Sequence, residues 1–151
     1  MFKHPVLLRP LLGTLLLGLV SFAAQAQTGT LYDRLGGDSA IKALASELID
    51  ATRADPQASR TFQEKVDIPR VKRLLAEQIC MLSQGPCQYS GDTMRQVHAG
   101  MHISEAEFYR MVELLVDVLQ KRGVGQRETN ELLALLAPMK RDIVEPRDAK
   151  K

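Results

Sequence analysis

The chain has 151 residues, of which 45% are hydrophobic and 25% are charged, with 20 lysines and arginines against 18 aspartates and glutamates. This composition is typical of a globular protein and excludes a disordered or fibrous chain, and the length allows one domain. Because only 5% of the residues are aromatic and tryptophan is absent, the core must consist mainly of aliphatic side chains and methionine, which favours packed helices.

The first 26 residues have the pattern of a secretory signal peptide. Basic residues precede an apolar run of 12 residues from Leu11 to Phe22, and the small residues of a cleavage site follow at Ala24-Gln25-Ala26. A membrane anchor is the alternative, but the run is shorter than the roughly 18 residues that a spanning helix needs. We therefore predict cleavage after Ala26 and a periplasmic or secreted protein.

Cleavage would leave 125 of the 151 residues, with 18 of the 20 basic residues against all 18 acidic ones. A neutral domain without a basic cluster does not fit a protein that binds nucleic acid or a membrane surface, because both attract clustered lysine and arginine. We expect one domain over residues 27–146, followed by a flexible tail at 147–151.

Apolar residues recur at helical spacing from Gly36 onward, and no segment alternates with the period of a strand, so we predict an all-α fold. The predicted helices are, in chain order, a long one from an Asp38 cap to Asp55-Pro56, a second from Ile68-Pro69 to Gln84-Gly85-Pro86, a short one from Met94 to His98, one from a Ser104 capping box to Gly123, and a last one from about Arg127 that bends at Pro138. The first long helix should bury Ile41, Leu44, Ala45 and Leu48.

His98 is the clearest candidate for a functional side chain. The chain has no Gly-rich phosphate loop, no Gly-x-Ser-x-Gly and no His-Glu-x-x-His. A neutral imidazole offers a lone pair to iron or zinc, and His98 belongs to the short predicted helix, with His102 four residues on. Taken alone, a single histidine is more often a core or surface residue than a metal ligand.

Several short motifs follow one another between Thr30 and Val144. They are Leu31-Tyr32-Asp33-Arg34-Leu35-Gly36-Gly37, Ala40-Ile41, Phe62, Gly85-Pro86, Tyr89-x-Gly91, Met94-x-x-x-His98, Ile103-Ser104-x-x-x-Phe108 and Leu136-Ala137-Pro138. Their order and spacing resemble the group I truncated haemoglobins over nearly the whole mature chain. The resemblance implies a two-over-two helical sandwich that holds haem b, a diatomic gas as ligand, and an electron donor that the sequence does not name.

The resemblance also implies roles for individual residues. His98 matches the proximal iron ligand of the family, and Phe62 matches its haem-stacking phenylalanine. Met94 lies one helical turn before His98 and should face the same way. The other expected cofactor contacts are Val71 and Leu75 over the iron, Leu115 and Leu119 at the haem floor, Arg95 or Lys72 at a propionate, and His102 at the pocket mouth.

The pocket face opposite His98 departs from the family. Many members carry a tyrosine near the middle of the first long helix, whose hydroxyl bonds to bound oxygen, and this chain has Ile49 there. Such a hydrogen bond contributes about 1.5 to 3 kcal/mol, so we predict weak oxygen retention, whereas carbon monoxide and nitric oxide depend less on it. Gln78, one turn beyond Leu75, would weaken this prediction if it turned inward.

Cys80 and Cys87 are the only cysteines. In an exported protein such a pair predicts a disulfide. The bond would join the end of the second helix to the loop that leads to His98, and it would add about 2 kcal/mol of stability.

Two other interpretations remain open at this point. Cys80, Cys87, His98 and His102 are suitable ligands for a structural zinc ion, but six residues separate the cysteines rather than the usual two to four. A helical interaction module without a cofactor also fits the composition, although the short helix at Met94 packs poorly in a plain bundle. Within the haem interpretation, the sequence does not separate gas binding from a reaction such as nitric oxide dioxygenation.

Overall fold

The computed structural model describes residues 29–62 and 66–145, so the predicted signal peptide and tail lie outside the described residues. In this part the elements are, in chain order, α1 (Leu31–Arg34), α2 (Gly37–Ala54), the 3-10 turn η1 (Ser59–Phe62), α3 (Ile68–Leu82), α4 (Met94–His98), α5 (Glu105–Lys121), α6 (Gln126–Leu136), the 3-10 turn η2 (Ala137–Met139) and α7 (Lys140–Ile143). The described residues contain no strand, and none of their helices is long and apolar enough to cross a membrane.

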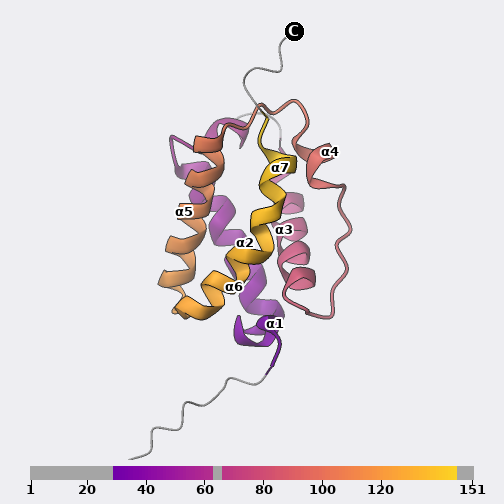
Figure 1. The fold of residues 1–151 in the computed structure, drawn as a ribbon, viewed down its shortest axis with the longest axis vertical. Helices are drawn as coiled ribbons and strands as arrows, with labels where there is room; N and C mark the ends of the chain where they lie inside the picture. The colour runs from indigo at the N-terminus through magenta and orange to yellow at the C-terminus, as the bar shows by residue number, and fades with distance from the viewer. Residues whose placement is uncertain (1–28, 63–65, 146–151) are drawn as a thin grey trace, which may run out of the picture.

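The long helices form two layers, with α2 and α3 in one and α5 and α6 in the other (Figure 1). The long helix α2 packs against both α3 and α5, and thereby joins the layers. At one end of the molecule α1 contacts α6, and at the other end the short α4 contacts α7. The predicted two-over-two sandwich is confirmed.

Local chemistry explains where most of the helices begin. Asp67 accepts a hydrogen bond from the backbone N–H of Arg70 at the start of α3, and Ser104 forms the predicted capping box with Glu107 at the start of α5. The start of α2 differs from the prediction, because Asp38 lies inside the first turn and Gly36 takes the cap position. Gly36 has a φ of 96°, and a residue without a Cβ adopts this left-handed turn at little cost.

The last predicted helix is divided rather than bent. It consists of α6, the 3-10 turn η2 and α7. Pro138 lies in η2, where its ring removes a backbone donor and prevents the α-helical hydrogen bonds from continuing. This break directs the segment after α6 toward α4.

The core between the layers is aliphatic. Its largest fully buried side chains include Ile41 and Ile49 of α2, Ile79 of α3, Leu119 of α5 and Leu132 of α6. All four residues that the periodicity of the first long helix placed inward are buried, as predicted. Near the α1 end, the guanidinium of Arg34 lies 3.0 Å from the carboxylate of Glu128, and both side chains are 8% exposed. This ion pair joins α1 to α6 at that end of the core.

Candidate functional site

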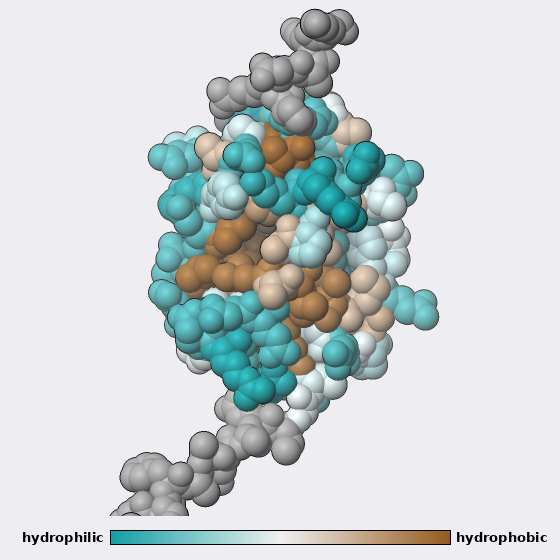
Figure 2. Space-filling model, viewed as in Figure 1, coloured by the Kyte–Doolittle hydropathy of each residue, from teal (hydrophilic) through white to brown (hydrophobic). Residues whose placement is uncertain are grey.

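An apolar cavity of about 360 Å³ lies between the helical layers. Its walls come from α2, η1, α3, α4, residues 99–103, α5 and the segment from Leu136 to Ile143. Figure 2 shows its mouth as a hollow in an apolar area, with hydrophilic side chains around it. Cofactor sites are typically apolar concavities of roughly 300 to 1,000 Å³ with a few polar groups, so this cavity is the candidate site.

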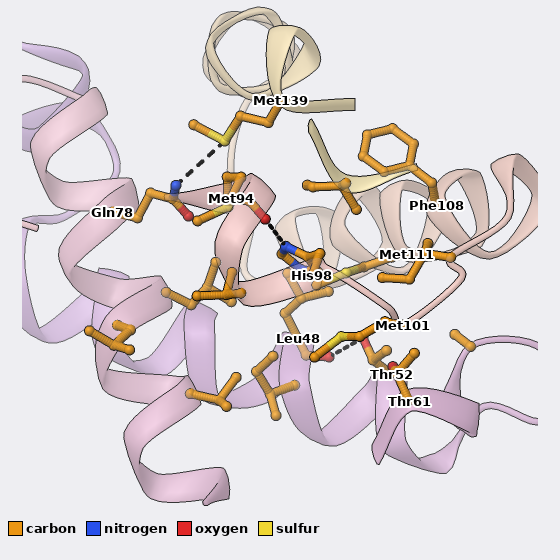
Figure 3. Close-up of a pocket in the computed structure, with 18 of the residues that line it drawn as sticks. Leu48, Thr52, Thr61, Gln78, Met94, His98, Met101, Phe108, Met111 and Met139 are labelled. Carbon is orange, nitrogen blue, oxygen red and sulfur yellow. Dashed lines mark hydrogen bonds between the residues drawn. The ribbon is translucent and has the colours of Figure 1, made fainter. Parts of the chain in front are cut away.

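His98 lines this cavity with one ring nitrogen already engaged. Its Nδ1 lies 2.8 Å from the backbone oxygen of Met94 (Figure 3). A carbonyl oxygen only accepts hydrogen bonds, so Nδ1 of the neutral ring must carry the proton. The lone pair is then on Nε2, and the hydrogen bond also fixes the orientation of the ring, as it does for many metal-binding histidines.

The helix that carries His98 is short and lies near the surface. Thr93 and Gln96 form a capping box at the start of α4, and none of the five residues of α4 is fully buried. A helix of this length gains little from its own hydrogen bonds. Its position therefore depends on the segments that flank it and on the contact with α7.

Five of the other predicted site residues also line the cavity. They are Phe62, Val71, Leu75, Met94 and Leu115. The tertiary structure therefore brings side chains from η1, α3, α4 and α5 to one place around the imidazole.

Leu119 does not line the cavity, contrary to the expectation. It is 0% exposed and packs in the core one helical turn beyond Leu115. The cavity residues of α5 run from Glu107 to Leu115, so the cavity ends before α5 does. Leu119 is a core residue because the helix continues past the site.

The two predicted propionate partners are engaged elsewhere. Arg95 is 77% exposed and lies 2.6 Å from a carboxylate oxygen of Asp142. Lys72 lies 2.6 Å from a carboxylate oxygen of Asp50. Neither residue lines the cavity, because each points along the outer surface toward an acidic partner on a neighbouring element.

Arg70 is a cavity residue that the sequence analysis missed. It is exposed, it borders the cavity on α3, and it forms no ion pair with another described residue. Burial raises the pKa of the nearby Tyr89, which also lines the cavity, and the positive charge of Arg70 opposes that rise. The sequence could have indicated this position, because Arg70 directly precedes Val71, which was expected over the iron, and lies in the first turn of the same helix.

The wall formed by α2 and α3 offers few hydrogen-bond donors. Ile49 lines the cavity and is 2% exposed. Thr52, one turn further on α2 and also missed, donates its hydroxyl proton to the backbone oxygen of Leu48 at 2.8 Å. The amide nitrogen of Gln78 lies 3.5 Å from the sulfur of Met139 (Figure 3). Ile49 and Thr52 therefore offer the cavity no proton, and Gln78 directs its amide to a weak acceptor.

The cysteines lie together at the end of α3. The structure pairs Cys80 with Cys87, with 5.9 Å between their Cα atoms. In the described part of the chain, no group of three or more histidine, cysteine, aspartate or glutamate side chains gathers in a way that could hold a metal ion. The structure therefore does not assemble the four zinc ligands of the alternative interpretation.

A two-layer helical sandwich that presents one imidazole to an apolar cavity defines the globin class. A sequence model of the bacterial-like globins matches residues 30–145. The chain is similar to group 1 truncated hemoglobin GlbN of Mycolicibacterium paratuberculosis, with 30% identity over 119 residues that cover 79% of this chain and 87% of that protein. It is also similar to group 1 truncated hemoglobin of Tetrahymena pyriformis, with 27% identity and coverage of 76% and 94%.

Solved structures agree with the sequence comparisons. The crystal structure of the Tetrahymena pyriformis truncated hemoglobin in its Fe(III) form superposes with a TM-score of 0.74 and 26% identity, covering 78% of this chain and 100% of that one. The chain belongs to the bacterial-like globin family, in which it is a group I truncated globin.

Proposed function

We propose that the cavity binds haem b, that Nε2 of His98 ligates the iron, and that the loaded protein reversibly binds diatomic gases. The observation that carries this proposal is the hydrogen bond from Nδ1 of His98 to the backbone oxygen of Met94, which leaves the lone pair of Nε2 free to bind the iron. The family membership supports the cofactor. When bound, the haem supplies an iron centre with a coordination position for a gas.

The residues present fit a haem group. The lining is largely aliphatic, with phenylalanine and methionine added, and it therefore suits an apolar porphyrin, whose burial supplies most of the binding energy. The paired Cys80 and Cys87 are the only cysteines, and their pairing leaves no thiol for a thioether link. This favours haem b, which is held without such a bond.

Spectra of the loaded protein test the proposal. We expect the wild-type chain to take up one haem and to show a Soret band that moves when carbon monoxide is added to the reduced form. His98→Gly should lose this spectrum, and added imidazole should restore it, because the free ring replaces the deleted ligand. Arg122→Gln is the control, since Arg122 does not line the cavity and pairs with Glu47 at the far end of α5. A variant lacking His98 with an unchanged spectrum would refute the assignment.

The same proposal places the haem propionates at the cavity mouth beside Arg70. A guanidinium can hold a carboxylate through two parallel hydrogen bonds, and this one borders the cavity. Arg70→Gln should therefore release haem several-fold faster to a scavenger protein, whereas Lys72→Gln, on the same helix but paired with Asp50 outside the cavity, should not. Equal rates for Arg70→Gln and wild type would contradict this position.

Weak oxygen retention belongs to the proposed function as well. Its support is the α2–α3 wall, where Ile49 is apolar and the proton of Thr52 is already used. The ferrous protein should oxidise rapidly in air, and an oxygen complex stable for many hours would contradict the proposal. Because the amide of Gln78 is directed at the sulfur of Met139, Gln78→Leu should change the oxidation rate little.

We also propose that the protein is exported and that Cys80 and Cys87 form a disulfide there. The Cα separation of 5.9 Å suits such a bond, and oxidising compartments are where disulfides persist. Fractionation of cells followed by mass spectrometry of the intact protein tests both points. The expected species begins at Gln27 and has no thiol that reacts with an alkylating reagent.

A further inference from the structure

The chain leaves His98 through residues 99–103, which take a conformation that needs outside support. Gly100 has a φ of 76° and His102 has a φ of 51°. A non-glycine residue is strained in this left-handed region and persists only where its surroundings hold it. The segment directly after the imidazole is therefore fixed by contacts with other elements.

Arg60 holds this segment from one side. It lies in η1, two residues before Phe62, and its Nη2 donates to the backbone oxygens of Met101 at 3.0 Å and of His102 at 3.1 Å. Its Nε donates to the carboxylate of Glu107 at 2.6 Å. One guanidinium thus joins η1, the segment after His98 and the start of α5.

The acidic anchor of Arg60 is itself held in place. The backbone N–H and the hydroxyl of Ser104 both donate to the carboxylate of Glu107, at 2.9 and 2.8 Å. Hydrogen bonds from Arg60 and Ser104 lower the pKa of Glu107 to about 2. The anchor is therefore charged throughout the physiological pH range.

Glu145 holds the same segment from the opposite side. Its carboxylate accepts the backbone N–H of Gly100 at 2.6 Å and lies 2.8 Å from Nδ1 of His102. Its own backbone N–H donates to the oxygen of Ile103 at 3.0 Å. The segment after His98 is thus held between η1 and Glu145, which is the second residue after α7.

We propose that Arg60 and Glu145 are positioning residues that set the geometry of His98 as an iron ligand. The helix α4 buries none of its side chains completely, so the place of the imidazole depends on the segments at its two ends. Arg60 and Glu145 fix the segment at the C-terminal end, where His98 is the last helical residue. This inference rests on the proposed function, in which Nε2 of His98 binds the haem iron.

The test compares four variants of the full, haem-loaded chain. Arg60→Gln and Glu145→Gln remove the contacts, and Arg60→Lys keeps the charge without the forked geometry. Arg122→Gln is the matched control, because Arg122 also lies 2.7 Å from a carboxylate, that of Glu47, near the opposite end of α5. The readouts are the iron–histidine stretching frequency of the reduced protein, measured by resonance Raman, and the rate of haem loss to a scavenger.

Arg60→Gln and Glu145→Gln should lower the stretching frequency and speed haem loss on the order of tenfold, corresponding to about 1.4 kcal/mol. Arg60→Lys should lie between these variants and wild type, and Arg122→Gln should match wild type in both readouts. An unmoved frequency in Arg60→Gln and Glu145→Gln, or an equal shift in Arg122→Gln, would overturn the inference while leaving the proposed function intact. A wild-type chain that takes up no haem would instead overturn the proposed function.

Discussion

Replacing Ile49 with tyrosine should slow the release of oxygen from the haem-loaded protein. Ile49 is 2% exposed and lines the cavity on α2, so a hydroxyl introduced there would face the cavity rather than solvent. A hydrogen bond to a charged acceptor contributes about 1.5 to 3 kcal/mol, and each 1.4 kcal/mol is a factor of ten, so release should slow by roughly 10- to 150-fold.

The control for this substitution is Ile49→Phe, which introduces the same ring without the hydroxyl. Both variants enlarge a packed side chain and should lose a similar amount of stability, about 1 to 3 kcal/mol. The difference in their oxygen release rates, measured by rapid mixing with carbon monoxide, therefore isolates the hydrogen bond. Equal release rates for the two variants would refute the explanation that oxygen is held weakly because a hydrogen-bond donor is missing.

Three further predictions concern stability. Reduction of the Cys80–Cys87 pair should lower the free energy of unfolding by about 2 kcal/mol; denaturation midpoints that do not respond to reductant would contradict the bond. Leu119→Ala should lower the free energy of unfolding by about 2 to 5 kcal/mol with no change in the haem spectrum. A spectral change would show that Leu119 contacts the haem. Because Arg60 and Ser104 lower the pKa of Glu107 from 4.5 to about 2, this carboxylate contributes stability that is complete above pH 4.5 and is lost as the pH falls through 2. Glu107→Gln should flatten acid unfolding over that range, and an unchanged acid curve would count against the ion pair.

Local signals in the sequence predicted the long helical segments and α4, because caps and breakers act over a few residues. The short helix α1 (Leu31–Arg34) was not predicted. Ser104 starts α5 as its capping box indicated, and Pro138 interrupts the last helix. The left-handed Gly36 shows the limit of this reasoning. Asp38 was a chemically suitable cap, but the turn between α1 and α2 gives the cap position to Gly36.

The cavity contacts were only partly predictable. Helical periodicity indicates which face of a helix is apolar, and Leu115 and Leu119 share that face of α5, but only Leu115 reaches the cavity. In the same way, Arg70, Lys72 and Arg95 are all plausible partners for an anion. Which of them is available depends on carboxylates that distant parts of the chain place beside the other two.

The sequence by itself determined the helical segments, the aliphatic core and the imidazole on a short helix, because these depend on spacing and on neighbouring residues. The tertiary structure alone decided where the cavity ends, that Arg70 borders it, and that Arg60 and Glu145 meet the segment after His98. These contacts join residues more than 40 positions apart in the chain. Their partners are set by the packing of whole helices, which no local pattern encodes.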